Sequence, residues 1–286
     1  MSQIVWLGDM GCDEPRAVGG KAAQLSRLSR YQAVPAGFCL TAGASRTDRD
    51  EAAAAVPAAL SQLVRDAYTE LGRKLAVIDP AVAVRSSAID EDGALASFAG
   101  IYTTYLNVRG SDAVLAAIAR CWASAKDPRV IEYRRQRGSE SAGLAVIVQD
   151  LVAADSSAVV FSANPTTGAT DQIVINANYG LGESVVGGLA TPDSWVVRKS
   201  DLSSLRFVLG HKEQMTILSA EGTREVPVLP TLRRRPCLSA AQVGALARLA
   251  LQLESAMGWP VDIECAFRGD SLYLLQCRPI TALAVP

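Results

Sequence analysis

The residues best placed to do chemistry lie in the last patterned stretch of the chain. Apolar and polar residues alternate there on both sides of a Gly-Asp-Ser sequence, which is typical of a β-hairpin with a short loop. A three-residue loop, Gly269–Ser271, places Glu264 opposite Gln276. The same register places Asp262 opposite Arg278, and all four side chains share one face because side chains alternate along a strand. A two-residue loop would shift the pairing by one residue and break this sorting.

The predicted hairpin has one polar face and one core face. In the three-residue-loop register Arg268 faces Leu272, and the core face carries Ile263, Cys265, Phe267, Tyr273, Leu275 and Cys277. On the polar face, a carboxylate beside an amide oxygen suits Mg²⁺, which prefers oxygen ligands and shares them with phosphates. An arginine on the same face suits a phosphate, which it can bind with two hydrogen bonds. The alternative is a solvent-facing hairpin with ordinary polar side chains.

Two further segments have the composition of an anion site. Gly19-Gly20-Lys21 precedes a helical stretch, and glycines at a helix entrance let backbone N–H groups approach a phosphate. This is not a P-loop, because the Walker spacing and the Ser/Thr after the lysine are missing, and an ordinary helix start is the alternative. Arg85-Ser86-Ser87 ends a predicted strand, where an arginine beside small hydroxyl residues suits an anion. A surface loop with self-paired charges is the alternative there.

The elements that must position these residues follow from hydrophobic periodicity. The pattern predicts helices over 22–30, 57–74 and 239–257, with two more beginning at Ser111 and Asp127, and strands over 4–7, 81–87, 101–108, 144–149, 158–162, 172–178 and 195–198. Ser239 and Gln242 form a capping box at the start of the last helix. Residues 42–56 are typical of a mobile loop or frayed helix. The glycine-rich segment 179–190 is typical of a flexible connector or of a lid over a ligand.

Composition excludes several classes of protein. The chain has 286 residues, of which 49% are hydrophobic and 20% charged, and its net charge is −1. This balance gives no electrostatic reason to bind nucleic acid or an anionic membrane surface. We find no signal peptide and no apolar run near the ~20 residues that span a bilayer. The six cysteines form no metal-binding spacing with the single His211, so we expect buried thiols and a reduced, cytoplasmic protein.

Taken in order, the motifs resemble the ATP-binding domain of the phosphoenolpyruvate synthase and pyruvate phosphate dikinase family, which includes rifampicin phosphotransferases. The resemblance covers almost the whole chain, and no single motif is specific, but their order is. The motifs are Gly19-Gly20-Lys21, Val82-Ala83-Val84-Arg85-Ser86-Ser87, Ser97-Phe98-Ala99-Gly100, Thr104-Tyr105-Leu106-Asn107-Val108, Phe161-Ser162-Ala163-Asn164-Pro165-Thr166-Thr167-Gly168, Gly180-Leu181-Gly182-Glu183, Thr191-Pro192-Asp193, Asp262-Ile263-Glu264 and Leu275-Gln276-Cys277-Arg278-Pro279.

The resemblance implies an α+β, ATP-grasp-like fold in which two lobes, residues 1–149 and 150–286, hold ATP between them. It implies that Lys21 and Arg85 contact phosphates and, with Arg278 at the phosphate tail, neutralise the charge that builds up during transfer. It also implies that the second lobe carries the metal-binding hairpin.

The implied cofactors are ATP and Mg²⁺. The resemblance assigns the metal to Glu264 and Gln276. It assigns the adenine edge to the backbone of a hinge strand formed by Gln149, Asp150 and Leu151.

The sequence departs from the family pattern where the phosphate acceptor should be. Family members usually continue into a swivelling domain with a phosphate-accepting histidine, whereas this chain ends at Pro286 and His211 matches no such motif. Ala22 replaces a frequent glycine, and Asp150 is unexpected at the hinge. We therefore expect phosphate to pass in trans to a small molecule or a separate His-carrier protein. The alternatives are a self-contained ATP-grasp ligase or small-molecule kinase, and a nucleotide-binding module without turnover.

Overall fold

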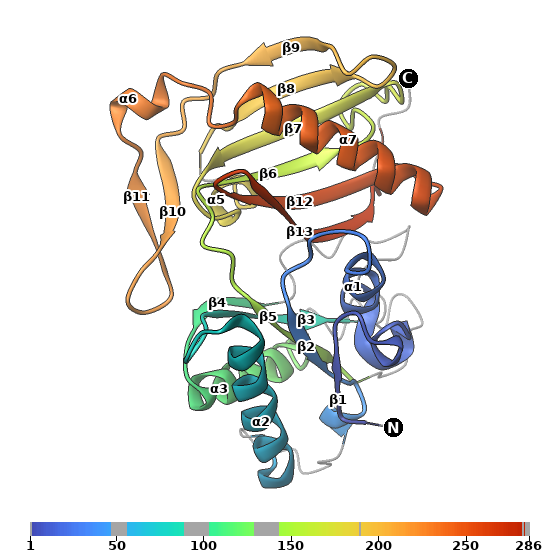
Figure 1. Cartoon of the computed structure of the whole chain (residues 1–286), viewed down its shortest axis with the longest axis vertical. Coiled ribbons are helices and arrows are strands. Elements are labelled where there is room, and N and C mark those ends of the chain that lie inside the picture. Colours follow the sequence, from blue (N-terminus) through green and yellow to red (C-terminus); the bar gives the residue numbers. More distant parts are fainter. Residues whose placement is uncertain are drawn as a thin grey trace. The chain divides into compact units, whose positions relative to one another are not determined.

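The chain folds into two compact units, Met1–Leu151 and Val152–Pro286 (Figure 1). The computed structural model describes residues 2–46, 56–88, 103–128, 143–188, 190–281 and 283. Each unit combines helices with antiparallel sheet, so the predicted α+β class is confirmed. The units divide after Leu151, close to the boundary at residue 149 that the sequence predicts.

The first unit is built on a five-stranded antiparallel sheet with β5 at its centre. Its strands, in spatial order, are β1 (Ile4–Trp6), β2 (Gly37–Leu40), β5 (Ala145–Asp150), β3 (Val82–Ser87) and β4 (Thr104–Val108). Its helices are α1 (Pro15–Leu28), α2 (Ala58–Leu75) and α3 (Ser111–Ser124), with short 3₁₀ turns η1 (Met10–Cys12) and η2 (Ala44–Arg46).

The strand β5 is covered on both faces, as its near-continuous apolar sequence predicts. Val146 and Val148 belong to a core cluster with α2 and α3. Ala145 and Ile147 point the other way, into a second cluster with α1. Since fully burying one such side chain contributes about 1.5–3 kcal/mol, the centre of this sheet is its best-anchored part. Strand β3 lies directly beside β5, so the Arg85-bearing strand is held by that core.

The second unit is a six-stranded antiparallel sheet with α7 (Ala240–Met257) packed against it. Its strands, in spatial order, are β13 (Ser271–Pro279), β12 (Val261–Arg268), β6 (Ser156–Phe161), β7 (Gln172–Tyr179), β8 (Asp193–Arg198) and β9 (Ser204–Val208). A separate two-stranded ribbon, β10 (Gln214–Leu218) with β11 (Thr223–Pro227), and two short helices, α5 (Glu183–Val186) and α6 (Pro230–Arg233), complete it. The predicted capping box of Ser239 and Gln242 starts α7, and left-handed Gly258 ends it.

The β12–β13 hairpin confirms two of the predicted pairs and corrects the loop. Asp262 lies opposite Arg278, and Glu264 lies opposite Gln276. However, Arg268 pairs with Ser271 rather than Leu272, so the loop has two residues, and its Gly269 takes the left-handed φ of 58°.

A bulge at Leu275 restores the register. The pairing shifts after Glu264, so that Cys265 lies opposite Leu274, and Leu275 is the extra residue. The predicted places of Tyr273 and Leu275 on the core face are therefore wrong. Leu274 is buried there instead, while Leu275 and Tyr273 are half-buried. The bulge is what keeps Gln276 and Arg278 on the polar face.

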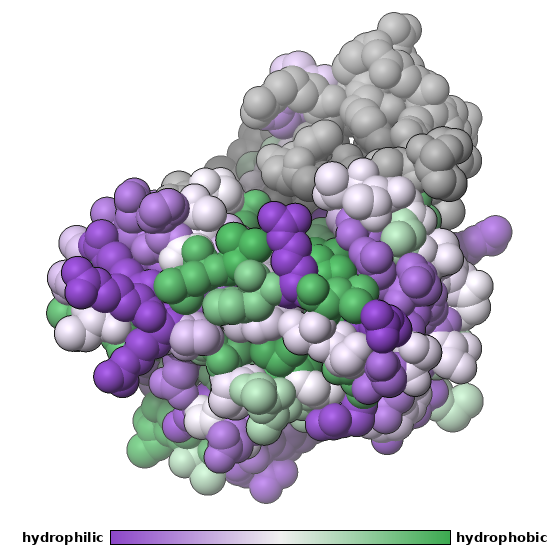
Figure 2. Space-filling view, turned by 90° about the horizontal axis from the view of Figure 1, so that it is seen from above, coloured by the Kyte–Doolittle hydropathy of each residue, from purple (hydrophilic) through white to green (hydrophobic). Residues whose placement is uncertain are grey.

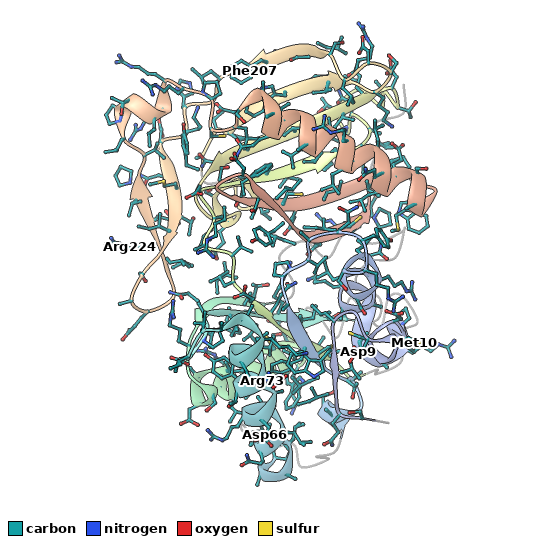
Figure 3. The ribbon with its side chains drawn as sticks, viewed as in Figure 1. Asp9, Met10, Asp66, Arg73, Phe207 and Arg224 are labelled. Carbon is teal, nitrogen blue, oxygen red and sulfur yellow. The ribbon has the colours of Figure 1, made fainter. Side chains whose placement is uncertain are left out.

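The outer edge of this sheet, β9, is apolar and exposed. Leu205, Phe207, Val208 and Leu209 have exposed fractions of 41–43%. Figure 2 shows this edge as an apolar area crossed by a hydrophilic side chain. Figure 3 shows Phe207 on β9 and Arg224 on the projecting ribbon.

All six cysteines are buried free thiols, which confirms the prediction from their apolar surroundings. No helix within the described part of the chain is long and apolar enough to cross a membrane. The first helix begins earlier than predicted, at Pro15, because a kink joins two helical segments. Several predicted features lie outside the described residues: the loop and Ser97–Gly100 motif between 89 and 102, most of segment 42–56, and the helix that follows Asp127.

The bulge generates a prediction about stability. Leu274→Asp places an unpaired charge in the core and is expected to lower the free energy of unfolding by about 3 kcal/mol or more. Leu275→Asp, at the half-buried bulge, is expected to cost much less and serves as the matched control. Urea unfolding followed by circular dichroism measures both. Equal losses would contradict the placement of the bulge.

Candidate functional site

In the first unit, the end of β3 meets a kink in α1 at Gly19. Gly19 has φ 79° and ψ 164°, and a Cβ atom there would lie 2.2 Å from the carbonyl oxygen of Ser87. Only glycine allows this approach. The helix then resumes against the strand end: the Gly20 N–H donates to the Ala88 carbonyl (3.0 Å) and the Ala22 N–H to Ser87 Oγ (3.1 Å).

This contact brings Lys21 to the end of β3, the strand that carries Arg85. Lys21 is only 7% exposed, and its Nζ donates to the Ser86 carbonyl at 3.4 Å. Arg85, the preceding residue of β3, is 9% exposed. Burial raises the pKa of the neighbouring Cys121 thiol to about 11, against the opposing effects of Ser86, Arg120 and Lys21, so this thiol is uncharged at neutral pH. Two largely desolvated cations at one strand end favour an anionic ligand.

The predicted hinge residues lie at the end of β5. The Gln149 side chain is buried and donates from Nε2 to the Pro35 carbonyl at 3.0 Å. The backbone N–H of Asp150 donates to Ala36 (2.8 Å) and that of Leu151 to Ala81 (3.0 Å). These three donors therefore already have acceptors within the first unit. That this segment binds the adenine edge stays a prediction, and other polar groups of the segment would have to make the contact.

In the second unit, the hairpin gathers its predicted site residues on one face. Glu264 and Gln276 form one cross-strand pair. Two pairs along, on the same face, Arg278 donates from Nε to Asp262 Oδ2 (2.9 Å), and a terminal nitrogen forms an ion pair with the same oxygen (2.8 Å). The other carboxylate oxygen, Oδ1, is buried and has no hydrogen-bond partner among the described residues. Asp262, which the sequence already places on this face, thus becomes a candidate metal ligand beside Glu264 and Gln276, a role that the sequence did not assign to it.

The unpartnered oxygen is the feature that a cation would satisfy. No group of three or more His, Cys, Asp or Glu side chains in the described ranges could hold a metal by itself. Asp262 and Glu264 with the amide oxygen of Gln276 instead offer two carboxylates and one neutral oxygen donor. Mg²⁺ characteristically uses one or two carboxylates and completes its shell with water and substrate phosphates. The residues present therefore fit Mg²⁺.

The electrostatics of Asp262 agree with this fit. Burial raises the pKa of the Asp262 carboxyl above its ordinary value, Arg278 opposes the rise, and the charge of Glu264 adds to it. A carboxyl group that is buried beside a second carboxylate ionises less readily, and a divalent cation nearby would favour its ionised form.

The chain matches the family described as pyruvate phosphate dikinase, AMP/ATP-binding domain, over residues 49–285. It is 38% identical to the prodigiosin synthesizing transferase PigC of Serratia marcescens, over 96% of this chain and 32% of that protein. It is 36% identical to a rifampicin phosphotransferase of Streptomyces sviceus, over 98% of this chain and 36% of the relative. It is 33% identical to a probable phosphoenolpyruvate synthase of Methanocaldococcus jannaschii, over 99% of this chain and 27% of that protein. The chain thus spans about a third of the length of these relatives.

The raised pKa of Asp262 predicts a pH dependence of stability. Because the folded state holds this proton more tightly than the unfolded state does, the free energy of unfolding should fall as pH rises from the unfolded pKa of about 4 through the raised folded pKa. Each unit of elevation corresponds to about 1.4 kcal/mol.

Urea unfolding of metal-free protein in EDTA, at a series of pH values, measures this slope. The Asp262→Asn variant should lack this dependence on pH. Its altered contact with Arg278 should change the free energy of unfolding only by the same amount at every pH. Parallel curves for the two proteins would contradict the assignment.

Proposed function

Because the chain belongs to the pyruvate phosphate dikinase AMP/ATP-binding domain family, we propose that it binds ATP with Mg²⁺ and activates it for phosphoryl or pyrophosphoryl transfer to an acceptor in trans. The observation that carries the proposal is the unpartnered Asp262 Oδ1 beside Glu264 and Gln276, on the same face as Arg278. A solvent-facing hairpin with ordinary polar side chains would not bury such an oxygen.

Each site residue has a role that its chemistry supports. Lys21 and Arg85 bind phosphate oxygens and neutralise their charge. Asp262 fixes the guanidinium of Arg278 with a hydrogen bond and an ion-pair contact, so the side chain is oriented before ligand binds. Asp262, Glu264 and Gln276 would hold Mg²⁺, which when bound adds further charge neutralisation. Phosphoryl transfer needs little covalent chemistry from the protein, so positioning and electrostatics are sufficient roles.

The acceptor is proposed to be a small molecule or a histidine on a separate carrier protein. His211, which matches no family motif for a phosphate-accepting histidine, lies exposed in the connection between β9 and β10. A carrier histidine must travel between two sites and normally sits on a small mobile domain. His211 instead lies between two strands of the second unit.

ATP with Mg²⁺ is expected to stabilise the fold by about 2.7 kcal/mol at a hundredfold excess over its dissociation constant. Glu264→Ala and Gln276→Ala should remove the Mg²⁺-dependent part of this gain and abolish turnover, with the fold intact. Glu225→Ala, an exposed change on β11, is the matched control. Thermal unfolding and calorimetry measure the effect. A wild-type protein that neither shifts its melt nor binds ATP would sink the nucleotide assignment.

Product analysis separates the possible reactions, and labelling tests the acceptor. AMP with phosphate indicates dikinase-type chemistry, whereas ADP indicates a simple kinase or a ligase. Protein incubated alone with ATP labelled at the β- or γ-phosphate should acquire no phosphohistidine. Acid-labile, base-stable label that is lost in His211→Asn would show that the chain carries its own phosphate and would overturn the transfer in trans.

A further inference from the structure

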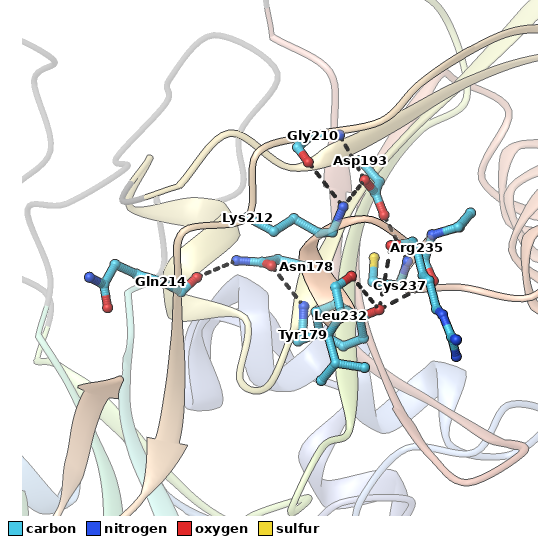
Figure 4. Close-up of polar contacts among 10 residues, drawn as sticks. Asn178, Tyr179, Asp193, Gly210, Lys212, Gln214, Leu232, Arg235 and Cys237 are labelled. Carbon is cyan, nitrogen blue, oxygen red and sulfur yellow. Dashed lines mark hydrogen bonds and ion pairs between the residues drawn. The ribbon is translucent and has the colours of Figure 1, made fainter. Parts of the chain in front are cut away.

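A completely buried ion pair lies at the base of the β10–β11 ribbon, outside the proposed site. Lys212 and Asp193 are both 0% exposed, and Lys212 Nζ donates to Asp193 Oδ1 and to the Gly210 carbonyl (3.0 Å) (Figure 4). Asp193 also accepts from the Gly210 N–H (2.8 Å) and, through Oδ2, from the Cys237 N–H (2.7 Å). Both carboxylate oxygens and the ammonium therefore have hydrogen-bond partners inside the protein.

The pair joins three segments that are distant in sequence. Asp193 begins β8, Lys212 lies in the connection between β9 and β10, and Cys237 precedes α7. The backbone of the connection is tightly constrained: Lys212 has a left-handed φ of 45°, and a Cβ at Gly210 would lie 2.2 Å from the Pro192 carbonyl oxygen. A buried ion pair is weak evidence for stability, since apolar pairs often replace one without loss, so its value lies in the arrangement that it enforces.

The connection positions β10, which begins two residues after Lys212. Strand β10 in turn contacts the glycine-rich loop 180–187. The Leu181 N–H donates to the Thr216 carbonyl of β10 at 2.9 Å. Asn178 donates from Nδ2 to the Gln214 carbonyl (2.9 Å) and to Ser184 Oγ (3.2 Å). The loop is thus bonded to β10 directly at Leu181, and Ser184 of α5 is linked to β10 through Asn178 of β7.

The strand register places this loop beside the proposed metal site. A Cβ at Gly182 would lie 3.7 Å from the Cβ of Ser157, so the loop touches β6 there. Ser157 is paired with Ala266, which follows Glu264 by two residues on the same face of β12. Two residues along a strand span roughly 6.6 Å. The loop therefore stands on the polar face, two residue pairs along the strands from Glu264.

We propose that Asp193 and Lys212 are positioning residues for the nucleotide site: their ion pair fixes β10, and β10 holds loop 180–187 as a wall on the Glu264 side of that site. This rests on the proposed function for its consequence, namely ATP binding. The positioning itself is a property of the second unit and does not depend on a ligand. The wall has a fixed place because moving it would break or expose a buried ion pair.

Amide hydrogen exchange in the wild-type protein without nucleotide tests the positioning directly. The Leu181, Lys212 and Cys237 amides, which are bonded across the loop, the connection and the segment before α7, should exchange in one opening event with the same denaturant dependence. Exchange of Leu181 at least tenfold faster than Lys212, with no shared dependence, would overturn the proposal.

A paired substitution then tests the consequence. Asp193→Leu with Lys212→Met replaces the ion pair by apolar side chains. In this variant the Leu181 amide should lose its protection against hydrogen exchange, and the dissociation constant for ATP with Mg²⁺ should rise by tenfold or more. The matched control is Lys199→Met with Glu254→Leu, which removes the ion pair between the end of β8 and α7 and should leave both unchanged.

The outcomes separate the two claims. Wild-type protein that does not bind ATP sinks the proposed function, while the exchange experiment still decides the positioning. Unchanged ATP affinity and unchanged Leu181 protection in the folded Asp193/Lys212 variant would overturn the positioning alone. If that variant does not fold, the wild-type exchange pattern decides between the two results stated above.

Discussion

The pairing of β12 with β13 is the constraint on which the candidate site depends. Side chains alternate along a strand, so one residue of slippage sends every side chain to the opposite face. With its two-residue loop and no bulge, the hairpin would set Gln276 opposite Ile263 and turn its amide toward the core. The extra residue at Leu275 reverses that parity over the last part of β13. The oxygen donors and the guanidinium share a face because of one irregular residue.

Both units bury charge at the ends or edges of well-anchored strands. Lys21 and Arg85 are both buried where α1 packs on the end of β3, and that strand is held by the doubly covered β5. Asp262 and Arg278 meet on the hairpin beside β6. Desolvated charges are costly, and a rigid backbone keeps them from relaxing into solvent. Groups held in this way interact more strongly with an oppositely charged ligand than the same groups would in water.

Local patterns predicted most of the elements and the placing of the polar residues on one face of the hairpin, while the chemistry of the site stays a prediction. Alternation along Asp262–Glu264 and the apolar run that became β5 are short-range signals, and the structure follows them. The bulge could not be predicted, because periodicity shows which residues alternate but not where a strand contains an extra residue. The burial of Lys212 could not be predicted for a different reason: between exposed His211 and Glu213, this lysine resembles part of a charged turn. Its partner Asp193 is distant in sequence, and only the tertiary fold brings them together.

The exposed edge strand β9 has a consequence for how the protein behaves in concentrated solution. An edge strand offers unpaired backbone groups to another chain, and apolar side chains on it make such pairing more favourable. Arg206 interrupts the apolar residues from Leu205 to Leu209. A charge at that position resists edge-to-edge stacking, because antiparallel pairing centred on it would set two arginines face to face. With a net charge of only −1 the chain has little overall repulsion to keep copies apart, so its resistance to self-association falls on single gatekeeper residues such as this one.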